Sequence, residues 1–210
     1  LALCTASALL LGGSIARAQD QTVRLGYCNG DKIGTALRPQ GEEGASNELS
    51  AAIKIPKETL AKYVGDTIYQ ISYANDTKVG AFMTGFSKTD LEGRSGGIVQ
   101  TVTDHKAGWN NVTLKTPYPI KADKDIYIGY TAYPNASEIN TAEILSTEYY
   151  HGGTPGVNWY GLNGQWWLLK TELVDYDFCI RAYARGKNMP TNDIGIDRVT
   201  NYDMVRQNKQ

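Results

Sequence analysis

The stretch TIYQISYAN, residues 67–75, decides the fold class of this chain. Its side chains alternate in character, so that Tyr69, Ile71 and Tyr73 fall on one face of an extended segment. Side chains of a β-strand point alternately to opposite faces of the sheet, so a period of two indicates a half-buried strand. Tyrosines on that face are typical of a core edge or a contact surface, because the ring is apolar and the hydroxyl is polar.

Segments of the same kind recur along the chain, separated by turn residues. The predicted strands are residues 22–28, 49–55, 67–75, 77–84, 96–103, 109–115, 125–133, 143–150, 165–170 and 176–184. Residues 29–48 read as a long loop rich in glycine and glutamate, and PKETLAKYVG, residues 56–65, as one short helix. Many short strands without strand–helix alternation predict an all-β, antiparallel sandwich or barrel with one short helix.

The two ends of the sequence differ in character from the middle. Residues 1–18 form an apolar run ending in Ala16-Arg17-Ala18, which predicts a secretory signal peptide that lacks its N-terminal part, with cleavage before Gln19. A lipoprotein signal with Cys4 as the lipidated residue is the alternative. We expect a β-sandwich module over 19–185, a linker over 186–193, and the start of a truncated second domain over 194–210. The alternative for the last segment is a terminal strand that folds back on the sandwich.

Composition excludes two classes of partner. The 210 residues carry a formal net charge of -1 and show no basic stripe, so nucleic acid is not an expected partner. No stretch after the leader approaches the roughly 20 consecutive apolar residues that a membrane-spanning helix needs. We therefore expect no membrane span in the module itself.

Cys28 and Cys179 are the cysteines that remain after the predicted cleavage. Alternation places each of them on the face of its strand that lies opposite the apolar face. Export permits a disulfide, and the two could pair if the first and last strands are neighbours. Two separate free thiols are the alternative. Two cysteines together with the isolated His105 and His151 do not have the spacing of a zinc site.

The sequence contains no recognisable catalytic motif. GxSxG, HExxH and phosphate-loop patterns are absent, and neither cysteine lies at a helix start. The pairs Asp123/Asp125 and Asp175/Asp177 could supply oxygens to calcium or serve glycoside hydrolysis, but aspartates beside turns are commonly solvated. We therefore predict a module that is not an enzyme and needs no cofactor, with calcium as the one candidate ligand ion.

Aromatic residues are concentrated in NWYGLNGQWWLLK, residues 158–170. Trp166 and Trp167 are adjacent, so in a strand they point to opposite faces. The candidate binding rim consists of Trp159, Tyr160, one of Trp166 and Trp167, and the loop with His151, since displayed aromatic rings stack on sugars or hold protein side chains. The alternative is that Trp159 and one of the adjacent pair fill the core.

Several phrases together resemble a known kind of module. These are RLGYCNG, LSAAIKIPKETLAKYVGDTIYQI, GWNNVTLKTPYPIKADKDIYIGY, WYGLNGQWWLL, DFCIRAYARG and NDIGIDRV. Together they span roughly residues 23–199. They resemble jelly-roll-like modules of secreted multidomain surface proteins and proteases of gut and oral Gram-negative anaerobes, and are similar to cleaved-adhesin domains followed by an Ig-like domain. The resemblance implies a jelly-roll-like sandwich with a secreted or cell-surface location. It also implies adhesion to a host protein, a glycan or neighbouring domains. A carbohydrate-binding module and an accessory domain of a cysteine protease are the alternatives.

Overall fold

The computed structural model describes residues 22–28, 31, 33–37, 48–75, 80–83, 97–121, 123–133, 144–147, 153–169 and 177–187. Within them the chain forms strands β1 (Thr22–Gly26), β2 (Ile33–Leu37), β3 (Leu49–Ile55), β4 (Thr67–Asn75), β5 (Gly80–Met83), β6 (Gln100–Val102), β7 (Gly108–Pro119), β8 (Ile126–Tyr133), β9 (Ile144–Thr147), β10 (Asn158–Leu162), β11 (Gln165–Leu168) and β12 (Ile180–Arg185). One short helix, α1 (Lys57–Leu60), continues into a 3-10 turn, η1 (Ala61–Tyr63).

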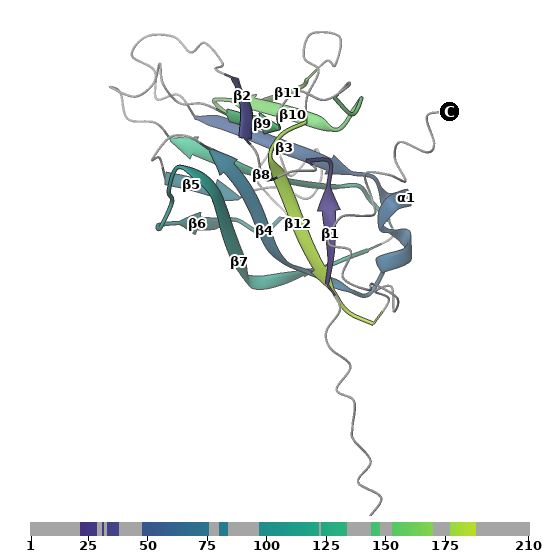
Figure 1. Cartoon of the computed structure of the whole chain (residues 1–210). Helices are drawn as coiled ribbons and strands as arrows, with labels where there is room; N and C mark the ends of the chain where they lie inside the picture. Colours follow the sequence, from purple (N-terminus) through teal and green to yellow (C-terminus); the bar gives the residue numbers. More distant parts are fainter. Residues whose placement is uncertain are drawn as a thin grey trace, which may run out of the picture.

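The strands form two antiparallel sheets, as Figure 1 shows. In sheet A the order is β1-β12-β4-β9-β2, with β7 paired to β4 as well. In sheet B the order is β11-β10-β3-β8-β5-β6. The first and last described strands are therefore neighbours, with Thr22 opposite Arg185 and Gly26 opposite Arg181. The predicted all-β fold with one short helix is confirmed.

The main core fills the space between the two sheets. Sheet A contributes residues such as Leu25, Ile71 and Ile180, and sheet B contributes residues such as Ile53 and Ile128, all of them at most 2% exposed. Burying apolar area of this kind is the main force that holds two sheets together. The period-two interpretation of residues 67–75 is borne out for Ile71 and Tyr73, which both belong to this core, but Tyr69 does not: the register shifts between Ile68 and Gln70, and Ile68 is buried in the core instead.

The short helix closes one end of the sandwich, directly after β3 (Figure 1). Leu60 and Tyr63 are buried there, at 0% and 1% exposure, and join the main core. Oδ1 of Asp125 accepts a hydrogen bond from the backbone N–H of Lys57 at 2.9 Å. This bond satisfies one of the unpaired N–H groups that every helix start exposes.

The bounds of the predicted strands differ from those observed by up to four residues, and three further differences change the set of elements or the turn in the aromatic stretch. The predicted loop 29–48 contains β2, and the aromatic stretch contains β10 in addition to β11. Within the segment GLNG, residues 161–164, Gly161 and Leu162 belong to β10. Asn163 and Gly164 alone turn the chain, with φ of 50° and 80°, which matches a two-residue hairpin of the type favoured by Asn-Gly.

Candidate functional site

The hairpin β10–β11 holds the aromatic residues at one edge of sheet B. Tyr160 lies opposite Trp167 and Gly161 opposite Trp166 in the antiparallel register. On its other side β10 pairs with β3, so β11 is the edge strand. The tip of the hairpin is fixed to the start of β3 by two hydrogen bonds: Asn163 N donates to the Glu48 carbonyl at 3.0 Å, and Glu48 N donates to Asn163 Oδ1 at 3.1 Å.

Trp159 and Trp166 lie on the outer face of sheet B. There they pack with Ala52 and Tyr127 in a cluster separate from the main core, and the rings of Trp159 and Tyr127 meet edge to face at 5.7 Å. A small residue makes room for the indole of Trp166: a Cβ on Gly161 would lie 3.0 Å from its Cε2 atom. Both tryptophans are half-buried, so this pair mainly covers the sheet.

Tyr160 and Trp167 lie on the opposite face of the same hairpin. Their rings stack at a centroid distance of 5.5 Å and an interplanar angle of 24°, and Tyr160 packs against the main core. Trp167 keeps 40% of its surface exposed. Gln165 is exposed and, two residues earlier on the strand, lies on the same face. We call Tyr160, Gln165 and Trp167 the edge platform.

The structure therefore divides the aromatic residues expected to form one rim. Trp159 and Tyr160 point to opposite faces of β10, so they do not present one continuous surface. The alternative that Trp159 and one of the adjacent pair fill the core holds in part: Trp159 and Trp166 pack on the buried Ala52 and Tyr127, but in a cluster separate from the main core. His151 lies outside the described residues.

A buried carboxylate fixes the turn that leads into β10. Asp177, 6% exposed, accepts hydrogen bonds from Thr154 N at 2.8 Å, Thr154 Oγ1 at 2.9 Å and Asn158 Nδ2 at 2.7 Å. Asn158 Oδ1 in turn accepts a bond from Phe178 N at 3.2 Å. These bonds give Asp177 a structural role and hold the start of the aromatic hairpin in place.

Of the two expected carboxylate pairs, Asp123/Asp125 is the one that lies wholly within the described residues. Oδ1 of Asp125 accepts the hydrogen bond from Lys57 N at the start of α1, and its Oδ2 lies 3.7 Å from Lys54 Nζ. Asp123 is exposed to solvent. Asp175 lies outside the described residues. Within the described part of the chain no group of three His, Cys, Asp or Glu side chains is placed to hold a metal ion.

His105 lies against a buried tyrosine. Its Nδ1 is 3.0 Å from the hydroxyl of Tyr73, and the two rings stack at 5.8 Å. Burial raises the pKa of Tyr73 well above its usual value. The contact gives His105 a packing partner and a hydrogen-bond partner.

Cys28 and Cys179 lie side by side on the outer face of sheet A. They form a small cluster with Ala74, against which Ile33 and Trp109 pack, and both are buried free thiols, 2% and 0% exposed. The assignment of both thiols to the face away from the main core agrees with the alternation in the sequence.

The two neighbouring thiols are chemically unequal. Hydrogen bonding by Cys179 lowers the pKa of Cys28 below its usual value; burial opposes this lowering, and the charge of Arg181 reinforces it. The same hydrogen bond, together with burial, raises the pKa of Cys179. Cys28 is therefore the thiol of the pair that loses its proton first.

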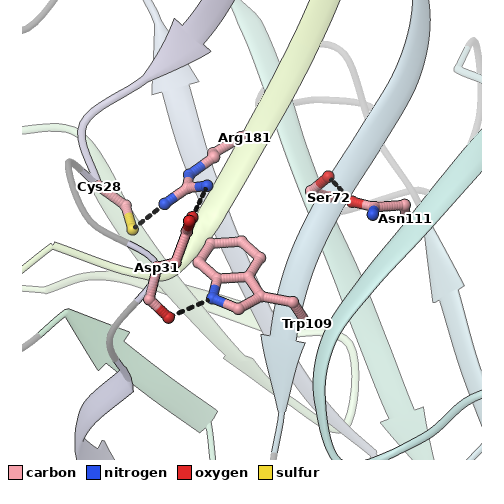
Figure 2. Close-up of polar contacts among 6 residues, drawn as sticks. All are labelled: Cys28, Asp31, Ser72, Trp109, Asn111 and Arg181. Carbon is pink, nitrogen blue, oxygen red and sulfur yellow. Dashed lines mark hydrogen bonds and ion pairs between the residues drawn. The ribbon is translucent and has the colours of Figure 1, made fainter. Parts of the chain in front are cut away.

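Arg181 lies beside Cys28, as Figure 2 shows. Its Nη2 lies 3.5 Å from Sγ of Cys28, and its Nη1 donates to Oδ1 of Asp31 at 2.8 Å. The guanidinium carbon lies 4.0 Å from the ring centroid of Trp109, whose Nε1 donates to the Asp31 carbonyl at 2.8 Å. Beside this cluster Ser72 donates a short hydrogen bond to Asn111 (Figure 2).

Sequence reasoning missed Asp31, Trp109 and Arg181 as neighbours of the cysteines. Alternation offered a signal for one of them, since Arg181 follows Cys179 by two residues and so lies on the same face of β12. Asp31 and Trp109 come from segments 78 residues apart, and their contact depends on the strand order of sheet A.

No protein-family model, no curated protein and no solved structure matches this chain. The described residues include no helix that is long and apolar enough to cross a membrane.

Proposed function

We propose that the chain is a non-catalytic binding module of a secreted or cell-surface multidomain protein, with a jelly-roll-like fold. The observation that carries the proposal is the edge platform. An indole with 40% of its surface exposed is fixed in place by stacking on Tyr160, which is itself anchored in the core. A rigid exposed aromatic side chain loses little conformational freedom on binding, which is why such residues are enriched where proteins bind partners.

A glycan is the ligand that this platform suits best. Sugar rings present flat C–H faces that pack on an indole, and their hydroxyls need polar partners beside it. Gln165 supplies such a group, because its amide has both donors and an acceptor and lies on the face of Trp167. A host protein remains the second candidate, favoured by the position of the platform on an edge strand, where an extended segment could add to sheet B.

The test compares two neighbouring substitutions. Trp167 and Leu168 are each 40% exposed but lie on opposite faces of β11, so Leu168→Ala is a control matched in position and exposure. Binding is measured against a panel of oligosaccharides and extracellular-matrix proteins. We expect Trp167→Ala to weaken binding to any ligand found at least about tenfold, the cost of one lost aromatic anchor, and Leu168→Ala to change it less than about twofold.

Acrylamide quenching of tryptophan fluorescence gives an independent readout. Trp167 is expected to supply most of the quenchable emission, and a ligand on the platform would protect it. Equal affinity of the Trp167→Ala variant and the unsubstituted chain would exclude the edge platform as the binding surface. Binding to matrix proteins without any oligosaccharide binding would exclude the glycan in favour of a protein partner.

A further inference from the structure

We propose that Cys28 and Cys179 are a redox pair that closes into an intramolecular disulfide linking β1 to β12, with Cys28 as the entering thiolate. The proposal is independent of the edge platform, which belongs to the other sheet.

The strand register brings the two residues together. In the β1–β12 ladder Gly26 lies opposite Arg181, and just beyond the end of this ladder Cys28 and Cys179 pack in one buried cluster. Neighbouring antiparallel strands bring facing residues to Cα separations of about 4.5–5.5 Å, within the range that a disulfide requires. Both side chains lie on the outer face of sheet A in one buried cluster, and Arg181 contacts Sγ of Cys28 there.

The surroundings of the pair favour attack by Cys28. Thiolates are the reacting species in disulfide exchange, and a neighbouring guanidinium stabilises them. Arg181 lies 3.5 Å from Sγ of Cys28 and is itself oriented by Asp31, which is bound to it at 2.8 Å. Hydrogen bonding to Cys28 and burial raise the pKa of Cys179, so Cys179 keeps its proton longer than Cys28 does.

The oxidant is a low-molecular-weight or carrier disulfide, of the kind met by exported proteins. Cys28 gives its proton to solvent, and its thiolate attacks one sulfur of that disulfide. A mixed disulfide forms, and the first carrier thiolate leaves. Cys179 then loses its proton and attacks Sγ of Cys28, so that the Cys28–Cys179 bond forms and the second carrier thiolate leaves. Two protein thiols are oxidised, one carrier disulfide is reduced to two thiols, and the two released protons reach the carrier thiolates.

The disulfide would close a loop of roughly 150 residues, and long loops give the largest stabilisation in the chain-entropy account. For a domain of this size we expect reduction to lower the apparent Tm by roughly 10 °C or more.

The experiment uses the full chain carrying Cys4→Ser, so that Cys28 and Cys179 are its remaining cysteines. The protein is refolded from urea in a buffer of reduced and oxidised glutathione, so that burial does not slow the oxidation of the two thiols. We expect peptide mapping to find residues 28 and 179 joined within one chain, and reductant to lower Tm. The matched control is the Cys28→Ser/Cys179→Ser double variant, whose Tm reductant should leave unchanged.

Two results would overturn the inference. One is full alkylation of both thiols in denaturant after oxidation, and the other is a linkage that joins two chains. The entering role is tested with the single variants under native conditions at neutral pH. Cys28 in the Cys179→Ser variant is expected to form a mixed disulfide with glutathione several times faster than Cys179 in the Cys28→Ser variant. Equal or reversed rates would remove the role assigned to Cys28.

Discussion

Replacing Asp177 tests whether a buried carboxylate organises the aromatic hairpin. The carboxylate accepts three hydrogen bonds of 2.7–2.9 Å from Thr154 and Asn158 while only 6% exposed. Asp177→Ala leaves three donors without their acceptor in a site poorly reached by water. Each unsatisfied buried group costs about 1–3 kcal/mol, part of which water recovers as it enters the space left by the carboxyl group. We expect a loss of about 3–5 kcal/mol in the free energy of unfolding. Asp177→Asn keeps the shape and one oxygen, so its expected cost is about 1–2 kcal/mol.

The assay is urea unfolding followed by tryptophan fluorescence, with the free energy taken by linear extrapolation. Asp123→Ala is the matched control, because it removes an equal charge from an exposed aspartate and should change stability by less than about 0.5 kcal/mol. Trp159, which follows Asn158 directly, should also become more accessible to acrylamide in the Asp177→Ala variant. A cost below about 1 kcal/mol for Asp177→Ala, or equal costs for the alanine and asparagine variants, would refute the reasoning.

The remaining predictions concern sheet packing and the arginine cluster. Gly129→Ala should destabilise the protein by at least about 2 kcal/mol in the same urea assay. The added Cβ would lie 2.1 Å from the Ala51 carbonyl oxygen and 2.8 Å from Cα of Ala52. An unchanged midpoint of urea unfolding would contradict this close approach of β8 and β3. The hydrogen bond from Arg181, and the charge of Arg181, lower the pKa of Asp31 in the folded protein. The ionised carboxylate therefore stabilises the fold at pH values above the ordinary pKa of an aspartate. This stabilisation is lost as the pH falls through the lowered pKa of the folded state. Relative to Asp31→Asn, the unsubstituted chain should therefore lose stability below about pH 4, by less than about 1 kcal/mol because Asp31 is exposed to solvent, and parallel pH profiles of the two proteins would exclude the ion pair.

Local patterns in the sequence predict the strands but not their partners. Period-two alternation finds β4 and assigns Ile71 and Tyr73 to the core, because one buried face is enough to mark a strand. It misses β2 and the separate β10, since glycines interrupt both stretches and hide the alternation. In β10 the glycine has a structural reason, because Gly161 leaves the space that Trp166 occupies. Strand order is a long-range property, so the contact of Arg181 with Trp109 could not be predicted from sequence.

The outer faces of the two sheets explain why the sequence could not say which tryptophan is exposed. An antiparallel sheet commonly has one polar face in water, and alternation then identifies the inside directly. Here each sheet also carries an apolar cluster on its outer face: Cys28, Ala74 and Cys179 under Trp109 on sheet A, and Ala52 and Tyr127 under Trp159 and Trp166 on sheet B. With apolar residues on both faces, adjacent Trp166 and Trp167 are equally suited to either side. The two tryptophans differ in their neighbours in the fold. Trp166 packs over Gly161 of the neighbouring strand β10. Trp167 stacks on Tyr160 at the edge of the sheet and keeps 40% of its surface exposed to solvent. The number of aromatic residues in a segment is therefore no measure of the size of a binding site, because most of this cluster covers its own sheet.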